Sequence, residues 1–112
     1  PIAAHSYLMA HAQEAFNQAV DATPMQTPTI PVIGNVRAAP LTSVEAVQAD
    51  LKAQLTSRVR WTETVERMVE QGITTYIEIG TGDVLSGLVK RISRDTQRFK
   101  LGEPADLAAL DA

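Results

Sequence analysis

The sequence predicts an α/β fold with parallel strands between helices. Residues 73–79 form a β-branched and aromatic run, residues 98–102 form a second short extended run, and the stretch between them has the apolar spacing of a helix. Parallel strands need a crossover connection, which is usually a helix. Strands that alternate with helical stretches therefore favour a parallel sheet.

Length and composition narrow the class of protein. The 112 residues fit one domain or a piece of a longer protein, and the start at Pro1 rather than Met favours a fragment. The net charge of −3 argues against binding to nucleic acid. Without cysteine there is no disulfide and no thiol nucleophile, as is typical of a reducing compartment. No apolar run approaches the roughly 18 residues of a membrane span, and no leader is visible, so we expect a cytoplasmic protein outside membranes.

The first predicted element is a helix over residues 6–22. Its apolar stripe consists of Leu8, Met9, Ala12, Ala15, Phe16, Ala19 and Val20. Ser6 is placed to cap this helix, so His5 lies just outside the positive end of the helix dipole. That position favours a neutral imidazole, the form that a general base needs. The simpler interpretation is that His5 only leads into a capped helix.

The next segment is rich in proline. Three prolines in residues 23–31 exclude a helix there. Residues 30–33 predict a short buried strand closed by a turn at Gly34 and Asn35, and Pro31 indicates an edge position or partial pairing. After a loop over residues 36–41, Thr42 and Glu45 have the spacing of a capping box, which predicts the start of a second helix.

Helical periodicity then continues. The second helix has an apolar face of Val44, Val47, Leu51 and Leu55 and is expected to end near residues 57–58. A third helix has Trp61, Val65, Met68 and Val69 on one face, with Gly72 as its C-terminal cap.

The clearest strand, residues 73–79, follows this cap directly. A turn at residues 80–82 leads into a fourth helix with Asp83 near its N-terminus and an apolar face of Val84, Leu85, Leu88 and Ile92. A last strand over residues 98–102 and a short helix over residues 104–110 complete the prediction.

Several familiar sites are not supported by the spacing. The turn at residues 80–82 lacks the third glycine of a dinucleotide site, where Leu85 stands, and has no P-loop lysine, so a structural turn is favoured. No serine lies in a G-x-S-x-G elbow, and Ser86 is interpreted as a small residue on a packed helix. His5 and His11 fall on different helix faces, so no metal site is expected.

A basic cluster interrupts the otherwise acidic chain. Its members are Lys90, Arg91, Arg94, Arg98 and Lys100. Such charges usually form a solvated face. The alternative is docking of an acidic partner, where complementary charge speeds encounter, and Arg58 and Arg60 would extend such a surface.

Four blocks in a fixed order resemble a known family. They are HSYLM at residues 5–9, IPVIGNV at 30–36, QLTSRVRW at 54–61 and EIGTGDVLSGL at 78–88. Together they resemble the C-terminal part of bacterial malonyl-CoA:acyl carrier protein transacylase. The resemblance runs from His5 to about residue 92, with a weaker match at Glu103 and Pro104. It departs from the family at Thr81, Asp83 and Arg58, where proline, lysine and proline are usual.

The resemblance implies an α/β-hydrolase-like acyltransferase domain with an inserted ferredoxin-like subdomain. Residues 1–112 would be the incomplete C-terminal portion of this single domain, lacking the nucleophile half and the insertion. The family transfers malonyl from coenzyme A to a serine and then to the phosphopantetheine thiol of acyl carrier protein in fatty-acid biosynthesis, without a cofactor. His5 matches the general base, and Gln54 matches the residue whose backbone carbonyl orients that base.

The resemblance also implies what this chain lacks and leaves two alternatives. The serine, the arginine for the malonyl carboxylate and the oxyanion amides would lie upstream, so this chain alone is expected to be inactive. Because Asp83 replaces the family's lysine, carrier-protein docking would be weaker or would fall to Lys90, Arg91 and Arg94. The alternatives are an acyltransferase domain of a polyketide synthase and a non-catalytic module that binds carrier protein.

Overall fold

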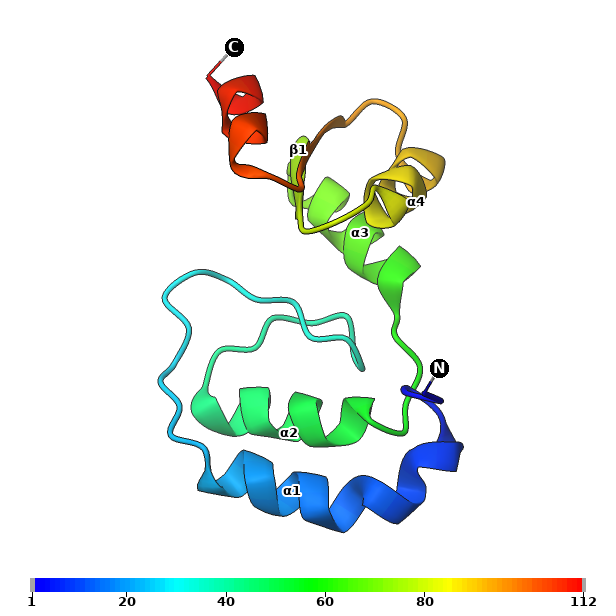
Figure 1. The fold of residues 1–112 in the computed structure, drawn as a ribbon, viewed down its shortest axis with the longest axis vertical. Coiled ribbons are helices and arrows are strands. Elements are labelled where there is room, and N and C mark those ends of the chain that lie inside the picture. Colours follow the sequence, from blue (N-terminus) through cyan, green and yellow to red (C-terminus); the bar gives the residue numbers. More distant parts are fainter. Residues whose placement is uncertain (1, 112) are drawn as a thin grey trace. The chain divides into compact units, whose positions relative to one another are not determined.

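The computed structural model describes residues 2–111, and the chain divides into two compact units, Pro1–Thr64 and Val65–Ala112 (Figure 1). The first unit contains the helices η1 (Tyr7–Ala12), α1 (Gln13–Ala22) and α2 (Val44–Gln54) and the beginning of α3 (Trp61–Glu70). The second contains the rest of α3, the strands β1 (Thr75–Ile79) and β2 (Gln97–Leu101), and the helices α4 (Val84–Ile92) and η2 (Pro104–Leu110). In the described part of the chain, no helix combines the length and apolar character needed to cross a membrane.

The first predicted helix exists but has two geometries. It begins as the 3₁₀ helix η1 (Tyr7–Ala12) and continues as the α-helix α1 (Gln13–Ala22). The predicted cap is confirmed, because the Ser6 hydroxyl accepts a hydrogen bond of 3.3 Å from the Leu8 amide. A tighter first turn of this kind is frequent at helix N-termini.

Helix α2 (Val44–Gln54) lies beside α1 (Figure 1). The Gln13 side chain on α1 donates to the Lys52 carbonyl at 2.9 Å, and Lys52 pairs with Asp21 at 2.6 Å. The predicted cap at Thr42 is wrong, because the neighbouring Ser43 hydroxyl accepts from the Ala46 amide at 3.1 Å. The helix also ends before the predicted residues 57–58.

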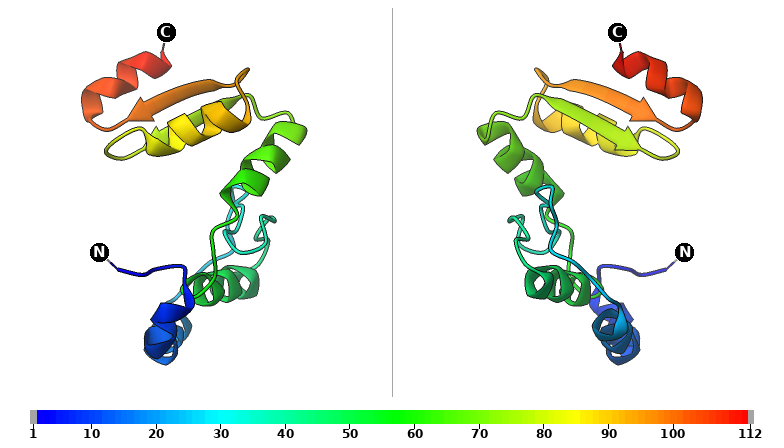
Figure 2. Two further views of the ribbon diagram at one scale, coloured as in Figure 1. Left: turned by 90° about the vertical axis from the view of Figure 1, so that its right-hand side faces the viewer. Right: turned by 90° about the vertical axis from the view of Figure 1, so that its left-hand side faces the viewer.

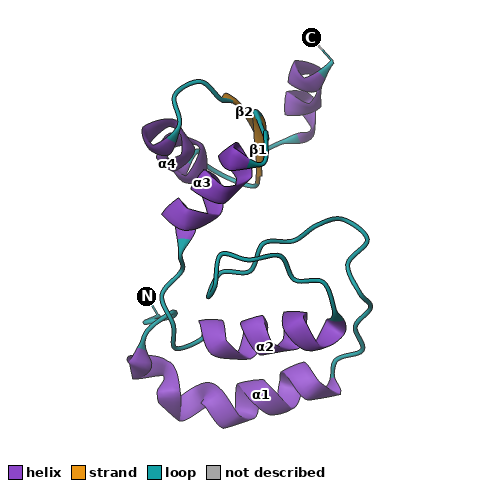
Figure 3. Cartoon of the chain, turned by 180° about the vertical axis from the view of Figure 1, so that it is seen from behind, coloured by secondary structure: helices purple, strands orange, loops and turns teal. Residues whose placement is uncertain are grey.

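The predicted buried strand at residues 30–33 is wrong. Figure 3 shows loop throughout the segment between α1 and α2, apart from one isolated antiparallel bridge that joins Ile33 to Pro40. Ile30 is 76% exposed. Proline has no amide hydrogen to donate to a ladder; Pro40 is one partner of this bridge, and Pro31 lies just before the paired residues. Two backbone bonds within the segment flank this bridge, from the Gly34 amide to the Ala39 carbonyl (2.9 Å) and from the Leu41 amide to the Val32 carbonyl (2.8 Å).

Helix α3 (Trp61–Glu70) ends as predicted at a glycine cap. Gly72 has φ +85° and donates to the Val69 carbonyl at 2.9 Å. The Ile73 amide then donates to the Met68 carbonyl at 3.0 Å, which commits that residue to the cap. Strand β1 (Thr75–Ile79) therefore begins later than the residues 73–79 predicted for it.

The predicted parallel sheet is confirmed in the second unit. Strand β1 pairs in parallel with β2 (Gln97–Leu101), with Ile77 opposite Phe99. Helix α4 (Val84–Ile92) forms the crossover and lies along the two strands (Figure 2). The terminal helix η2 (Pro104–Leu110) contacts β2 and is a 3₁₀ helix.

Candidate active site around His5

His5 is held by two successive carbonyls at the C-terminal end of α2. Its backbone amide donates to the Leu55 carbonyl at 3.0 Å, and its ring Nδ1 lies 2.8 Å from the Gln54 carbonyl oxygen. The last carbonyls of an α-helix have no partner within the helix, so this end of α2 offers acceptors; the Gln54 carbonyl also accepts a long bond of 3.4 Å from the Ser57 amide. His5 itself has φ +63°, a left-handed conformation that is uncommon outside glycine.

The contact with Gln54 fixes the tautomer of the His5 ring. A carbonyl oxygen only accepts, so Nδ1 carries the hydrogen and donates it. In the neutral ring, Nε2 then has a free lone pair, and the side chain is exposed. The arrangement can therefore accept a proton at Nε2 while Nδ1 stays anchored, as a general base requires. The catalytic roles of His5 and Gln54 stay predictions.

A second group of contacts surrounds Gln54. The Asn35 side chain donates from Nδ2 to Gln54 Oε1 at 2.9 Å, and the Asn35 carbonyl accepts from the Arg60 amide at 2.9 Å. The Asp50 carboxylate accepts from the amides of Asn35 (3.3 Å) and Val36 (3.1 Å). The sequence signalled Asn35 only as a turn residue and did not signal Asp50. The available clue was the i, i+4 spacing of Asp50 and Gln54, which places both on one face of α2.

Most of this chain is similar in sequence to known proteins. The malonyl CoA-acyl carrier protein transacylase of Bacillus subtilis (strain 168) is 39% identical over 100 residues, which cover 89% of this chain and 32% of that protein. That of Haemophilus influenzae is 37% identical over 110 residues, covering 98% and 35%. The chain resembles malonyl CoA-acyl carrier protein transacylases. It spans about a third of the length of these curated relatives, and no family model matches it.

Solved transacylase structures share the fold of the chain. The acyl carrier protein S-malonyltransferase of Vibrio cholerae O1 is 37% identical with a TM-score of 0.90, and the match covers 98% of this chain and 37% of that one. A malonyl-transacylase in complex with a type II polyketide synthase acyl carrier protein is 36% identical with a TM-score of 0.88, covering 97% and 37%. The predicted resemblance is thus confirmed for both sequence and fold.

Most side chains of the basic cluster are exposed, and one of them forms hydrogen bonds within the chain. Lys90 and Arg91 occupy the last turn of α4 and Arg94 follows it; all three are exposed and form no ion pair with the described residues. The Arg98 guanidinium instead turns back and donates to the carbonyl and hydroxyl of Thr96. Lys100 is also exposed and stands opposite Glu78 across the parallel strands.

The two arginines expected to extend the cluster belong to the other compact unit. Arg58 and Arg60 both pair with Glu63, Arg58 at 3.9 Å. The single carboxylate of Glu63 therefore offsets one of their two positive charges within their own unit.

The turn at residues 80–82, which carries the transacylase-like block, has a structural role. Gly80 and Gly82 have φ +133° and +91°, which only glycine adopts readily. The Glu78 carboxylate accepts the amides of Ser86 (2.8 Å) and Leu85 (3.1 Å) in the first turn of α4. The Ser86 amide and hydroxyl, with the Leu85 amide, lower the pKa of Glu78. Because a carboxylate of the chain itself fills this helix N-terminus, the structure provides no vacant anion site there.

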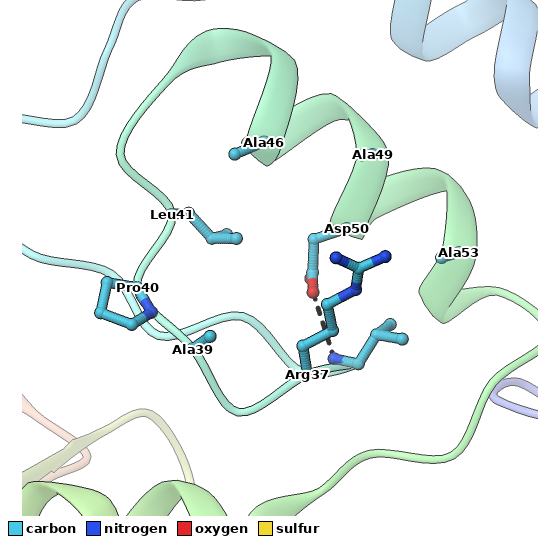
Figure 4. Close-up of a pocket in the computed structure, with 9 residues that line it drawn as sticks. Arg37, Ala39, Pro40, Leu41, Ala46, Ala49, Asp50 and Ala53 are labelled. Carbon is cyan, nitrogen blue, oxygen red and sulfur yellow. Dashed lines mark hydrogen bonds between the residues drawn. The ribbon is translucent and has the colours of Figure 1, made fainter.

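A separate apolar pocket lies between α2 and the loop over residues 36–41 (Figure 4). Its volume is about 420 Å³, and small apolar side chains form most of its wall, with Arg37 and Asp50 as the charged members. The carboxylate of Asp50 is already committed to the Val36 amide. No serine, threonine, cysteine or lysine lines the pocket, and residues 2–111 hold no group of three or more His, Asp or Glu suited to a metal.

Proposed function

We propose that this chain supplies the histidine-bearing C-terminal part of an acyltransferase domain. The domain would transfer malonyl from coenzyme A to the phosphopantetheine thiol of acyl carrier protein in cytoplasmic fatty-acid biosynthesis. The observation that carries the proposal is the 2.8 Å contact from His5 Nδ1 to the Gln54 carbonyl, which leaves Nε2 free. The similarity to malonyl CoA-acyl carrier protein transacylases supplies the reaction.

Part of the proposed domain lies outside this chain. Residues 1–112 form an incomplete domain, placed after the inserted ferredoxin-like subdomain, and the serine nucleophile belongs to an upstream segment. By itself the chain does not turn over malonyl-CoA, because a base without a nucleophile forms no acyl-enzyme.

In the first half-reaction, Nε2 of His5 accepts the hydroxyl proton as the serine oxygen attacks the malonyl thioester. The protonated ring then returns this proton to the departing coenzyme A thiolate. In the second half, Nε2 accepts the proton of the phosphopantetheine thiol, whose sulfur attacks the malonyl-serine ester, and returns it to the serine oxygen. The Gln54 carbonyl accepts the Nδ1 hydrogen throughout and holds the ring in one orientation.

The test compares two histidine variants in a chain completed by a serine-bearing upstream segment. His5→Ala should lower malonyl transfer to carrier protein by about 100- to 10,000-fold, since it removes the general base. His11→Ala is the matched control, because the His11 ring also contacts a carbonyl, that of Leu8 at 3.0 Å, and should leave transfer unchanged. Near-normal transfer by His5→Ala would refute the assignment.

A second pathway has an observation in its favour. One similar structure is a malonyl-transacylase bound to a type II polyketide synthase acyl carrier protein. The same chemistry would then load a polyketide carrier, and rates with fatty-acid and polyketide carrier proteins would separate the two pathways. A non-catalytic carrier-binding module, in contrast, would bind carrier protein and transfer no malonyl in the completed chain.

A further inference from the structure

We propose that Asn35 is a positioning residue for His5 and that it acts through the side chain of Gln54. The inference rests on the proposed role of His5 as the base. Asn35 touches neither His5 nor any reacting atom; its side chain contacts the residue whose carbonyl holds the imidazole.

Gln54 presents two different groups in two directions. Its backbone carbonyl accepts from His5 Nδ1 at 2.8 Å, and its side-chain Oε1 accepts from Asn35 Nδ2 at 2.9 Å. Gln54 is the last residue of α2, where no amide of the helix itself binds the carbonyl and terminal turns fray; the one local donor is the Ser57 amide, in a long bond of 3.4 Å. The side-chain bond therefore supplies an anchor that the helix does not, and it holds the carbonyl in the direction of His5.

Asn35 is itself held independently of Gln54. Its amide donates to the Asp50 carboxylate at 3.3 Å, and its carbonyl accepts from the Arg60 amide at 2.9 Å. Both of these contacts use the backbone of Asn35. Replacing its side chain with that of alanine thus removes only the link to Gln54 and keeps the contacts that position the loop.

The test measures the tautomer of His5 in the 112-residue chain by imidazole ¹⁵N NMR. In the unmodified chain we expect Nδ1 to carry the hydrogen. Asn35→Ala should lower the ratio of the Nδ1–H to the Nε2–H form by about tenfold, the effect of losing one hydrogen bond. His11 is the internal control: its Nδ1 contacts a carbonyl of its own helix, and its tautomer ratio should not change.

A double-mutant cycle separates this role from a merely structural one. Gln54→Ala removes the same side-chain bond from the helix side and keeps the backbone carbonyl. The two single variants and the double variant should shift the His5 ratio equally, because residues that act through one contact are not additive. The proposal is overturned by no shift in either single variant, by additive shifts, or by an equal shift at His11. Gln54→Ala keeps every residue of the loop, so an unshifted His5 ratio in this variant overturns the proposal even if Asn35→Ala does not fold.

Activity in the completed chain distinguishes this proposal from the proposed function. Asn35→Ala should lower kcat about tenfold with KM for malonyl-CoA unchanged, the change of one hydrogen bond. If His5→Ala retains full transfer, the catalytic role of His5 fails, while the NMR result still decides whether Asn35 orients its ring.

Discussion

Gly34 is the position where an added methyl group should disturb the candidate site most. Gly34 is buried, and its φ lies outside the left-handed region, so its backbone conformation does not require glycine. The position requires glycine because the surrounding atoms leave no space for a side chain. A Cβ there would lie 2.5 Å from Oδ1 of Asp50 and 2.9 Å from Cδ2 of Leu41. Both distances are below van der Waals contact, so Gly34→Ala must displace the Asp50 carboxylate.

The cost follows from what this carboxylate does. Overpacking a filled site costs about 1–3 kcal/mol. Asp50 also accepts the amides of Asn35 and Val36, and losing one hydrogen bond to a charged group costs about 1.5–3 kcal/mol. Because the two effects overlap and the site is only partly buried, we expect Gly34→Ala to lower the free energy of unfolding by about 3 kcal/mol.

Urea unfolding followed by fluorescence provides the assay. Trp61 is the one tryptophan of the chain and belongs to the same compact unit as Gly34. Gly87→Ala is the matched control: it lies inside α4 with nothing within 4 Å of an added Cβ. By far-UV circular dichroism it should raise stability by about 0.5–1 kcal/mol through helix propensity. A Gly34→Ala value within about 0.5 kcal/mol of the unmodified chain would refute the packing argument.

Two further predictions concern charge. The hydrogen bond from the Ser86 amide is the largest cause of the lowered pKa of Glu78. The ionised Glu78 carboxylate therefore stabilises the fold fully above the ordinary pKa of 4.5, and this stabilisation disappears as pH falls through the lowered folded-state pKa. The urea concentration at the unfolding midpoint should therefore be lower for Glu78→Gln than for the unmodified chain at pH 7, and the two midpoints should be equal in strong acid. Equal midpoints at pH 7 would contradict this. Arg91→Glu in the completed chain should weaken carrier-protein binding several-fold at low salt and less at high salt. Arg37 is also exposed, and Arg37→Glu, which makes the same charge change, should not weaken binding. Equal weakening by both would indicate a net-charge effect in place of a docking surface.

Local signals predicted the second unit well. Gly72 and the glycines of the turn at residues 80–82 require backbone conformations that other residues avoid, so they mark the boundaries around β1. The apolar periodicity of α4 between two extended runs was enough to predict the parallel crossover. The errors arose where two adjacent residues offer the same chemistry, as Thr42 and Ser43 do, or where proline removes the donors that a predicted strand needs.

The candidate site depended on information that local patterns do not contain. His5 and Gln54 are 49 residues apart, and only the resemblance of four ordered blocks to one family paired them. Asn35 was visible as a turn residue, but its link to Gln54 depends on where α2 ends. A one-residue shift in that boundary would change which carbonyl faces His5, and boundaries are the least certain part of a sequence prediction.

The chain uses two helix ends in opposite ways. At the N-terminus of α4, the Glu78 carboxylate satisfies the first amides, which closes that end to an external anion. At the C-terminus of α2, the carbonyls of Gln54 and Leu55 are satisfied by the side chain and backbone of His5. The left-handed backbone of His5 costs about 1–2 kcal/mol, and these two contacts oppose that cost. The residue at which α2 ends therefore determines the orientation of the proposed base. A variant that extends α2 by one turn would lose this orientation of the imidazole even with His5 unchanged.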